Sequence, residues 1–390
     1  MTMKICMLDP LFYPYYGGTE KVVLEVGKRL VRNHGCEVEV LTSMIPQAKG
    51  VKQEEIEGIK VYRTPSLYFD NLPAFLPPPF TISPFLNLYI LKHGDADIYH
   101  IHNRFWYYWG TLATIKLLLR KKLMLTIHNA RPKGISPDVD FWGGLYDDTL
   151  GRVLFSACDR INCVSRATLE ATIPAEMHRK CAVIYNGVDT KRFKPGTGRE
   201  KIRDRLGIGD APLVLSNGRL ITQKGFPYLL DAFAGVKEQI KDAKLLIIGR
   251  GPMKEQLLTH ARSLGIADSF SITTGIPEDE LPAYYDAADV FVLPSLYEPG
   301  AVVLYEALSC GKPIVATNVG GNSEIVSSEC GFIVPPCDSR ALEERILTLL
   351  ADEKLMGRMG AASRKRAVEN FDWDIITEEW MKSYEAAYST

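Results

Sequence analysis

Residues 290–317 read VFVLPSLYEPGAVVLYEALSCGKPIVAT, and this stretch decides the fold class of the chain. Its first four residues form a continuous apolar run that is typical of a buried strand, and residues 314–317 form a second such run. Between the two runs lies an apolar segment that begins near Ala301 and is long enough for a helix. The stretch therefore predicts a strand, a loop, a helix and a strand, which is the repeating unit of a parallel α/β sheet.

Two glutamates lie in this stretch, Glu298 on the predicted loop and Glu306 inside the predicted helix. Ligands of open α/β sheets bind beyond the carboxyl ends of the strands, which is where Glu298 would lie. The N-terminus of the helix adds backbone N–H groups that suit an anion. Most glutamates are simply solvated surface charges. Glu306, however, has apolar neighbours on both sides, and a carboxylate in such a helix needs a partner, which a ligand can be.

The composition of the whole chain predicts a soluble enzyme. Its 390 residues suit two domains of ordinary size, and 46% apolar residues are enough for a sizeable core. A formal net charge of −1 gives no electrostatic reason to expect nucleic acid as the main partner. The chain enters an apolar strand almost at once and has no run long enough to span a bilayer, so we expect a cytoplasmic protein without a signal peptide. The eight cysteines lack the spacing of a zinc site and predict reduced, buried thiols.

Strands and helices alternate on both sides of a loop at residues 190–198, which contains Pro195, Gly196 and Gly198. This pattern predicts two doubly wound, Rossmann-like domains, at residues 1–190 and 191–370, that face each other across a ligand cleft. In the first half we expect strands at residues 3–8, 37–42, 98–102, 123–128, 160–164 and 181–185, and a helix at residues 19–32. In the second half we expect strands at residues 213–217, 244–249, 270–274, 290–293, 314–317 and 331–334. The helices expected there lie at residues 225–240, 253–264, 279–288, 301–309 and 339–350.

Two further loops could bind an anion. Gly17 and Gly18 precede the first helix and would let the backbone approach a ligand closely, although paired glycines also occur in plain flexible turns. Gly218, Arg219 and Lys224 belong to the loop that follows the first strand of the second half. Two cations beside a helix N-terminus suit a diphosphate, whereas ordinary surface cations would need no ligand.

Three histidines, His100, His102 and His128, lie at the ends of neighbouring predicted strands. Alternation along a strand places His100 and His102 on the same face of the sheet. The three side chains could together hold a metal, but oxygen and sulfur ligands are scarce around them. We therefore expect no metal site, and a hydrogen-bonded core histidine is the simpler interpretation of His100 and His102.

Taken together, these motifs resemble those of the retaining glycosyltransferases of the GT-B fold, in glycosyltransferase family 4 (glycosyl transferases group 1). The resemblance covers nearly the whole chain. It rests on Gly17-Gly18-Thr19-Glu20, Thr126-Ile127-His128, Tyr185-Asn186-Gly187-Val188-Asp189, the loop from Gly218-Arg219 to Lys224-Gly225, and the pair of glutamates. The chain departs from the family pattern after Glu298, where it reads Pro-Gly-Ala, and after His128, where it reads Asn-Ala-Arg.

The resemblance implies a hexosyltransferase whose second domain binds a nucleotide-diphospho-sugar, with a UDP-sugar favoured and a GDP-sugar possible. The first domain would bind a sugar, glycolipid or small-molecule acceptor, and the C-terminal helix at residues 371–390 would pack back on it. No metal cofactor is implied, and retention would come from front-face attack assisted by the leaving phosphate. The implied contacts are Arg219 and Lys224 with the diphosphate, Glu306 with the ribose, Glu298 and His128 with the donor sugar, and Gly17, Gly18, Gly218, Gly300, Ala301, Val302 and Val303 with sugar or phosphate through the backbone.

Two other functions fit the same architecture: a sugar-nucleotide 2-epimerase and an inactive sugar-binding protein.

A separate pattern concerns the acceptor. Residues 67–91 and 105–122 are rich in aromatic and apolar side chains, and the second segment ends in the basic cluster Arg120-Lys121-Lys122. This combination predicts peripheral contact with the inner face of a membrane and a lipid-linked acceptor. The alternative is that these residues form core and the wall of an acceptor pocket.

Overall fold

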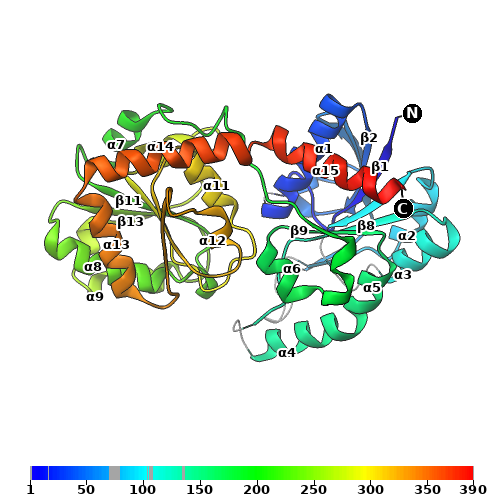
Figure 1. Cartoon of the computed structure of the whole chain (residues 1–390), viewed down its shortest axis with the longest axis horizontal. Helices are drawn as coiled ribbons and strands as arrows, with labels where there is room; N and C mark the ends of the chain where they lie inside the picture. Colours follow the sequence, from blue (N-terminus) through cyan, green and yellow to red (C-terminus); the bar gives the residue numbers. More distant parts are fainter. Residues whose placement is uncertain are drawn as a thin grey trace. The chain divides into compact units, whose positions relative to one another are not determined.

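The computed structural model describes residues 2–15, 17–69, 80–102, 104, 109–133 and 137–389. The chain divides into two compact units. Unit 1 comprises Met1–Asn186 together with Trp373–Thr390, and unit 2 comprises Gly187–Asp372. Each unit is an α/β domain built on a mainly parallel sheet, which confirms the predicted fold class (Figure 1).

Unit 1 is built on a sheet with the strand order β10-β9-β8-β7-β1-β2-β4-β3, in which β3 alone pairs antiparallel to its neighbour. Its strands are β1 (Lys4–Leu8), β2 (Glu37–Ser43), β3 (Gln53–Ile56), β4 (Ile59–Thr64), β7 (Ile98–His102), β8 (Lys122–Ile127), β9 (Arg160–Cys163) and β10 (Cys181–Val183), with β5 (Leu67–Phe69) and β6 (Phe80–Ile82) forming a separate pair. Its helices are α1 (Gly18–His34), α2 (Leu86–Lys92), α3 (Trp109–Ala113), α4 (Pro137–Tyr146), α5 (Arg152–Ala157), α6 (Arg166–Thr172) and α15 (Trp373–Ser389). Short helical turns are η1 (Pro46–Ala48), η3 (Thr114–Leu118), η4 (Asp147–Gly151) and η5 (Ala175–Lys180).

Helices cover both faces of the unit 1 sheet (Figure 1). On one face, α2, η3 and α5 contribute Ile90, Ile115 and Phe155 to a cluster of buried apolar side chains. On the other face, α1 packs against α15, which also contacts β7, β8 and β9. The amphipathic pattern of α1 explains its place, because Val23 and Val26 point into the core.

The C-terminal helix α15 is bonded to the unit 1 sheet by polar contacts. The Tyr384 hydroxyl lies 2.7 Å from Nδ1 of His100, and Ser383 Oγ donates to Oδ1 of Asn162 at 2.7 Å. The division between the units falls after Asn186 and before Trp373, whereas the sequence placed it at residues 190 and 371. A 2.8 Å backbone hydrogen bond from Val188 to Phe371 joins the two segments next to this division, and both residues belong to unit 2.

Unit 2 has a parallel sheet with the order β13-β12-β11-β14-β15-β16. Its strands are β11 (Leu213–Asn217), β12 (Lys244–Ile248), β13 (Phe270–Thr273), β14 (Val290–Leu293), β15 (Ile314–Thr317) and β16 (Gly331–Val334). Its helices are α7 (Arg199–Leu206), α8 (Phe226–Gln239), α9 (Lys254–Ser263), α10 (Leu281–Ala287), α11 (Val302–Ser309), α12 (Asn322–Ile325), α13 (Ser339–Leu350) and α14 (Glu353–Asn370), with 3₁₀ turns η6 (Thr222–Lys224) and η7 (Ala267–Ser269). Each strand predicted for this half is present.

The strand order of unit 2 fixes where a ligand would bind. The chain runs outward from β11 through β12 to β13, then returns and runs outward from β14 through β15 to β16. This is the Rossmann order, and its direction reverses between β11 and β14. In Figure 1, α8, α9 and α13 cover one face of this sheet, while α7, α11 and α14 cover the other. The crevice outside the carboxyl ends of β11 and β14 is therefore the place to search for a site.

Some elements of the structure were missing from the sequence prediction. The β3–β4 hairpin turns at Glu57 and Gly58, which both have positive φ, of 53° and 83°. Both residues have the φ sign of a tight hairpin turn, but β3 reads Gln-Glu-Glu-Ile and has no apolar alternation to reveal it. In the second half, helices α7, α12 and α14 were likewise not predicted.

Candidate functional site

Two loops of unit 2 meet at the reversal point of the sheet. One follows β11 and contains Lys224; the other follows β14 and contains Glu298. The backbone N–H of Leu296 donates to the carbonyl of Gln223 at 2.7 Å, which joins the loops directly. Gly225 makes this approach possible, because its φ is 64° and a Cβ at this position would lie 2.0 Å from the carbonyl oxygen of Pro294.

The two loops place a cation against a carboxylate. Lys224 Nζ forms an ion pair with Oε2 of Glu298, and their side chains are only 16% and 8% exposed. Ser295 Oγ donates to the same carboxylate oxygen at 3.1 Å. The Glu298 backbone is also held, since Gly321 N–H donates to its carbonyl at 3.4 Å and a Cβ on Gly320 would meet that oxygen at 1.7 Å. Such a rigid, mostly buried ion pair provides fixed charge for a polar ligand.

The helix that follows Glu298 begins a few residues after the ion pair. Helix α11 begins at Val302, one residue later than predicted, and its N-cap Ala301 has no side chain that could cap the first turn. Val302 and Val303 therefore belong to this first turn, where backbone N–H groups favour an anion.

Glu306, farther along α11, is the end of a buried chain of hydrogen bonds. The Tyr285 hydroxyl donates to Oε2 of Glu306 at 2.8 Å, and Asn217 Nδ2 donates to the Tyr285 hydroxyl at 3.0 Å. Glu306 is only 3% exposed, so the solvated-surface interpretation of this residue is wrong. Asn217 ends β11, and Tyr285 lies on α10.

The three histidines predicted at strand ends lie close together in unit 1. His100 is hydrogen-bonded through both ring nitrogens, to Tyr384 and, at 2.8 Å, to Thr126 Oγ1, so it is a core histidine with its polar atoms satisfied. His102 Nδ1 lies 3.1 Å from His128 Nε2. Burial lowers the pKa of His128 to about 3, which keeps its ring neutral near pH 7. Within the ranges that the structure describes, no group of three His, Cys, Asp or Glu side chains could hold a metal ion.

The glycine pair lies beside α1 in the same unit. Gly17 is the extended N-cap of α1, and Gly18 is its first residue. A Cβ on Gly17 would meet Oε2 of Glu20 at 2.2 Å, so a larger residue would displace this carboxylate. The close approach observed at Gly17 is thus to the Glu20 side chain, and the predicted approach to a ligand stays a prediction.

Comparison with known proteins identifies the family. A family model for "Glycosyltransferase Family 4" matches residues 16–192, and one for "Glycosyl transferases group 1" matches residues 198–366. The chain is 34% identical, over 96% of both sequences, to a GDP-mannose-dependent alpha-(1-6)-phosphatidylinositol monomannoside mannosyltransferase of Mycobacterium tuberculosis. It is 30% identical, over 99% of its length and 98% of the other sequence, to an uncharacterized glycosyltransferase of Methanocaldococcus jannaschii. The chain belongs to glycosyltransferase family 4.

Further comparisons extend this result. A Mycolicibacterium smegmatis mannosyltransferase with the same description as the tuberculosis enzyme is 38% identical over 48% of this chain and 51% of that protein. Among solved structures, the HepE protein of Anabaena in complex with UDP has a TM-score of 0.78 at 21% identity, over 98% of this chain and 100% of that one. Sucrose-phosphate synthase of Thermosynechococcus elongatus also has a TM-score of 0.78, at 23% identity and 99% coverage of both chains. These structural matches confirm the GT-B fold. The family models and the mannosyltransferase relatives confirm the predicted class, a hexosyltransferase.

The predicted site residues of this family 4 enzyme fall into separate groups. Lys224 and Glu298 are brought into contact, and Glu306 lies on the helix that Glu298 precedes. Arg219 is exposed, and in the part of the chain that the structure describes no hydrogen bond links it to the other predicted residues. Sequence reasoning missed Tyr285, Asn217 and Ser295. The position of Asn217 at a strand end could have suggested it, but nothing local distinguished Tyr285 from the tyrosine before it.

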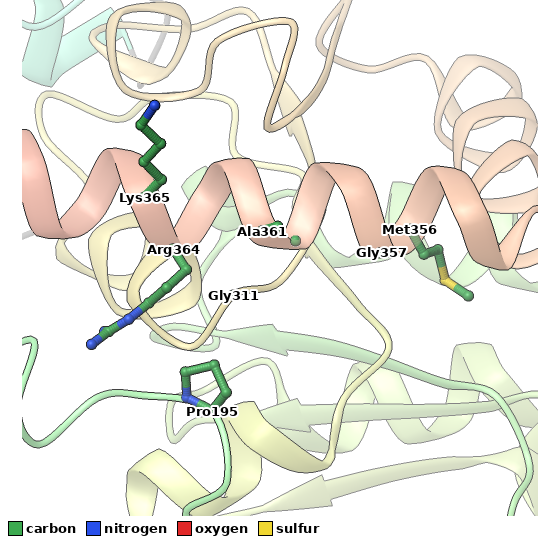
Figure 2. Close-up of a pocket in the computed structure, with 8 residues that line it drawn as sticks. Pro195, Gly311, Met356, Gly357, Ala361, Arg364 and Lys365 are labelled. Carbon is green, nitrogen blue, oxygen red and sulfur yellow. The ribbon is translucent and has the colours of Figure 1, made fainter.

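A shallow groove lies elsewhere in unit 2. Its volume is about 440 Å³, and it is lined by Pro195, Gly311 and one face of α14 (Figure 2). It lies at the C-terminal end of α11, just before β15 begins, whereas Glu298 precedes the opposite end of that helix. Its Arg364 guanidinium is already bonded to the carbonyls of Thr190 and Phe193. This groove is therefore separate from the loops that carry Lys224 and Glu298.

Proposed function

We propose that this enzyme transfers a hexose from a nucleotide-diphospho-sugar bound in unit 2, with retention of the anomeric configuration and without a metal ion. The observation that carries the proposal is the mostly buried Lys224–Glu298 ion pair at the reversal point of the sheet, beside the N-terminus of α11. A cation and helix N–H groups suit a diphosphate, and the carboxylate suits sugar hydroxyls. One small region thus offers partners for both halves of such a donor.

GDP-mannose is our proposed donor. The sequence alone favoured a UDP-sugar, with a GDP-sugar as the alternative. The full-length tuberculosis relative, described as GDP-mannose-dependent, supports GDP-mannose at 34% identity. The UDP complex of HepE has only 21% identity to this chain and bears on the fold alone. UDP-glucose is therefore the competing donor in the test below.

Each proposed role follows from the chemistry of its side chain. Lys224 and Arg219 would neutralise charge that develops on the departing nucleoside diphosphate, Glu306 would accept hydrogen bonds from the ribose, and Glu298 from the sugar. The acceptor hydroxyl would attack C1 on the face that the leaving phosphate vacates. Its oxygen would form the new bond to C1, the bond from C1 to the phosphate oxygen would break, and the hydroxyl proton would pass to that phosphate. Fixed charge aimed at the leaving group is the main source of catalysis in this scheme.

A donor panel tests the proposal. The purified full-length protein is incubated with GDP-mannose, UDP-glucose or ADP-glucose, without and with candidate acceptors, and the products are followed by NMR. We expect slow release of mannose from GDP-mannose alone and an α-linked product when an acceptor is present. Conversion of the nucleotide sugar to its 2-epimer would favour the epimerase function instead. Unchanged nucleotide sugars without detectable binding would indicate an inactive protein and overturn the proposal.

We also propose that the acceptor is amphipathic and is met at an anionic membrane surface. Helix α2 contacts η3, and these two elements expose Leu88, Leu91, Leu117 and Leu118, the last two by 73% and 69%. The basic cluster at residues 120–122 follows η3 after one intervening residue, Leu119. Exposed leucines beside cations are suited to the surface of an anionic bilayer. The tuberculosis relative, whose name includes phosphatidylinositol monomannoside, supports a lipid acceptor.

The structure corrects one part of the membrane prediction. Phe80 and Leu86, which the sequence grouped with the surface aromatics, are buried and belong to unit 1's interior. Residues Phe75, Leu76 and Phe105–Tyr108 lie outside the described residues. In the described part of the chain no helix is both long and apolar enough to cross a bilayer.

Flotation with vesicles decides between the two interpretations of this surface. We expect the protein to float with anionic phosphatidylglycerol vesicles at low salt and to be released as salt rises. The pair Lys121→Glu and Lys122→Glu should abolish flotation, and Leu117→Ser with Leu118→Ser should weaken it. The matched control is Lys354→Glu with Lys365→Glu on α14 in unit 2, which should change nothing. No flotation of the unaltered protein at low salt would leave a water-soluble acceptor as the better proposal.

A further inference from the structure

Tyr285 links three elements of unit 2 at one buried point. Its hydroxyl donates to Glu306 on α11 at 2.8 Å and accepts from the side-chain amide of Asn217 on β11 at 3.0 Å. Tyr285 itself is fully buried on α10. The hydroxyl therefore ties the end of a central strand to the carboxylate of a neighbouring helix through the side chain of a third element.

Packing fixes the position of this hydroxyl. The Tyr285 ring lies 5.5 Å from the ring of Phe291 on β14 and meets the Phe193 ring edge-on at 5.9 Å. A buried aromatic ring with two such neighbours has little freedom to move its hydroxyl. Burial, and then the adjacent Glu306 carboxylate, raise the pKa of Tyr285 well above its ordinary value. The phenol thus keeps its proton near pH 7 and remains a donor.

We propose that Tyr285, supported by Asn217, is a positioning residue that holds the Glu306 carboxylate in the orientation that distinguishes ribonucleotides from 2′-deoxyribonucleotides. This inference rests on the proposed function, in which Glu306 accepts hydrogen bonds from the ribose. A carboxylate accepts well from a ribose diol only when the diol hydroxyls lie near the plane of the carboxylate. Side chains that bind a ligand-contacting group commonly set its orientation in this way. Without the Tyr285 bond, the carboxylate would lose a charge-assisted contact and could rotate away from the diol.

Calorimetric titration of the full-length protein provides the test. GDP and 2′-deoxy-GDP are titrated into the unaltered protein and into Tyr285→Phe, and the same is done with UDP and 2′-deoxy-UDP. We expect the unaltered protein to prefer the ribonucleotide by about tenfold or more, which is the range of one hydrogen bond to a charged group. Tyr285→Phe should reduce that preference by at least about threefold, while the deoxyribonucleotide should bind nearly as before. In turnover assays the same variant should raise the donor KM and leave kcat nearly unchanged.

Matched variants separate this role from general damage to the fold. Tyr284 precedes Tyr285 on α10, and its hydroxyl accepts from Arg205 Nη1 at 3.3 Å instead. Tyr284→Phe should therefore keep the ribonucleotide preference. Glu306→Gln should lose it, and Tyr285→Phe combined with Glu306→Gln should lose no more, because the two residues would act through one contact. If Tyr285→Phe does not fold, Asn217→Ala tests the same chain and should shift the preference in the same direction.

The outcomes distinguish the inference from the proposed function. No binding of any nucleoside diphosphate by the unaltered protein would overturn the proposed function and this inference with it. Binding without a ribonucleotide preference would overturn the ribose contact of Glu306 and hence the inference, but would leave a nucleotide-sugar enzyme possible. A preference that is retained in Tyr285→Phe and in Asn217→Ala would refute the positioning role alone.

Discussion

Replacing Lys224 by alanine separates the structural and catalytic contributions of the ion pair. The change leaves the Glu298 carboxylate with its 3.1 Å hydrogen bond from Ser295 but without its cation. Because the Glu298 side chain is only 8% exposed, water can replace little of the lost interaction. We therefore expect a loss of folding free energy and, separately, a loss of turnover.

The expected size of each loss follows from the burial of the pair. Breaking a fully buried ion pair costs about 3–5 kcal/mol, whereas an exposed pair contributes about 0–1 kcal/mol. The Lys224–Glu298 pair is mostly buried and keeps one hydrogen bond, so we expect about 2 kcal/mol, which lowers the Tm of a domain this size by about 4–8 °C. If Lys224 also neutralises the leaving group, its loss should lower kcat by about 100- to 1000-fold, as for other fixed charge-stabilising donors.

The assay combines thermal unfolding with turnover of the best donor found in the panel. Lys354→Ala, which removes an exposed lysine of α14, is the control and should leave Tm and kcat unchanged. Lys224→Ala combined with Glu298→Gln should be more stable than Lys224→Ala alone, because the unpaired buried charge is gone, yet it should remain inactive. A double variant less stable than the single one would refute the ion-pair reasoning. Near-normal turnover of Lys224→Ala would refute the leaving-group role.

Four further outcomes are expected. Turnover should survive excess EDTA; a complete loss that Mg²⁺ or Mn²⁺ restores would contradict a metal-free mechanism. Glu298→Gln should lower kcat, whereas Glu306→Gln should mainly raise the donor KM, because ribose is remote from the bond that breaks; equal effects on kcat alone would contradict separate roles. Burial lowers the pKa of His128 from 6.5 to about 3, so the unfolded chain binds a proton at this residue more readily than the folded chain does. The free energy of unfolding should therefore fall as the pH drops below 6.5, by at most about 1.4 kcal/mol per pH unit. A Tm of unit 1 that stays flat from pH 7.5 to 5 would count against neutral burial of His128. Gly225→Ala should destabilise unit 2 far more than Gly207→Ala, because both glycines have a φ of 64° but only a Cβ at Gly225 meets backbone; similar Tm losses would show that φ strain alone acts.

The second half of the chain was well predicted because its strands are buried on both faces. A parallel sheet covered by helices gives continuous apolar runs such as residues 290–293 and 314–317, and these stand out in the sequence. Loops between such runs must lie at the strand ends, so the positions of Lys224 and Glu298 near the carboxyl edge also followed from the sequence. Polar β3 shows the limit of this reasoning, because an edge strand with exposed faces leaves no apolar run.

The contacts between site residues could not be predicted in the same way. That Lys224 reaches Glu298 depends on the backbone approach of Gly225 to Pro294, which joins loops far apart in the sequence. Tyr285 was missed for a related reason. It and Tyr284 look alike in sequence, and only the three-dimensional packing directs one hydroxyl to Glu306 and the other to Arg205.

The two acids of this site are held by different means, and this difference favours different roles for them. Glu298 is on a loop and its carboxylate is paired with the charge of Lys224, so a bound diphosphate would compete for the same cation and couple donor binding to the position of Glu298. Glu306 is inside a helix and is hydrogen-bonded to neutral Tyr285, which a ligand's charge would disturb far less. Because Glu298 would share Lys224 with the leaving phosphate, its contact with the sugar could change as the bond to that phosphate breaks. Glu306 is held by a neutral partner, so its contact with the ribose would be the same in the ground state and the transition state. On this reasoning we expect Glu298 to contribute to turnover and Glu306 to donor affinity.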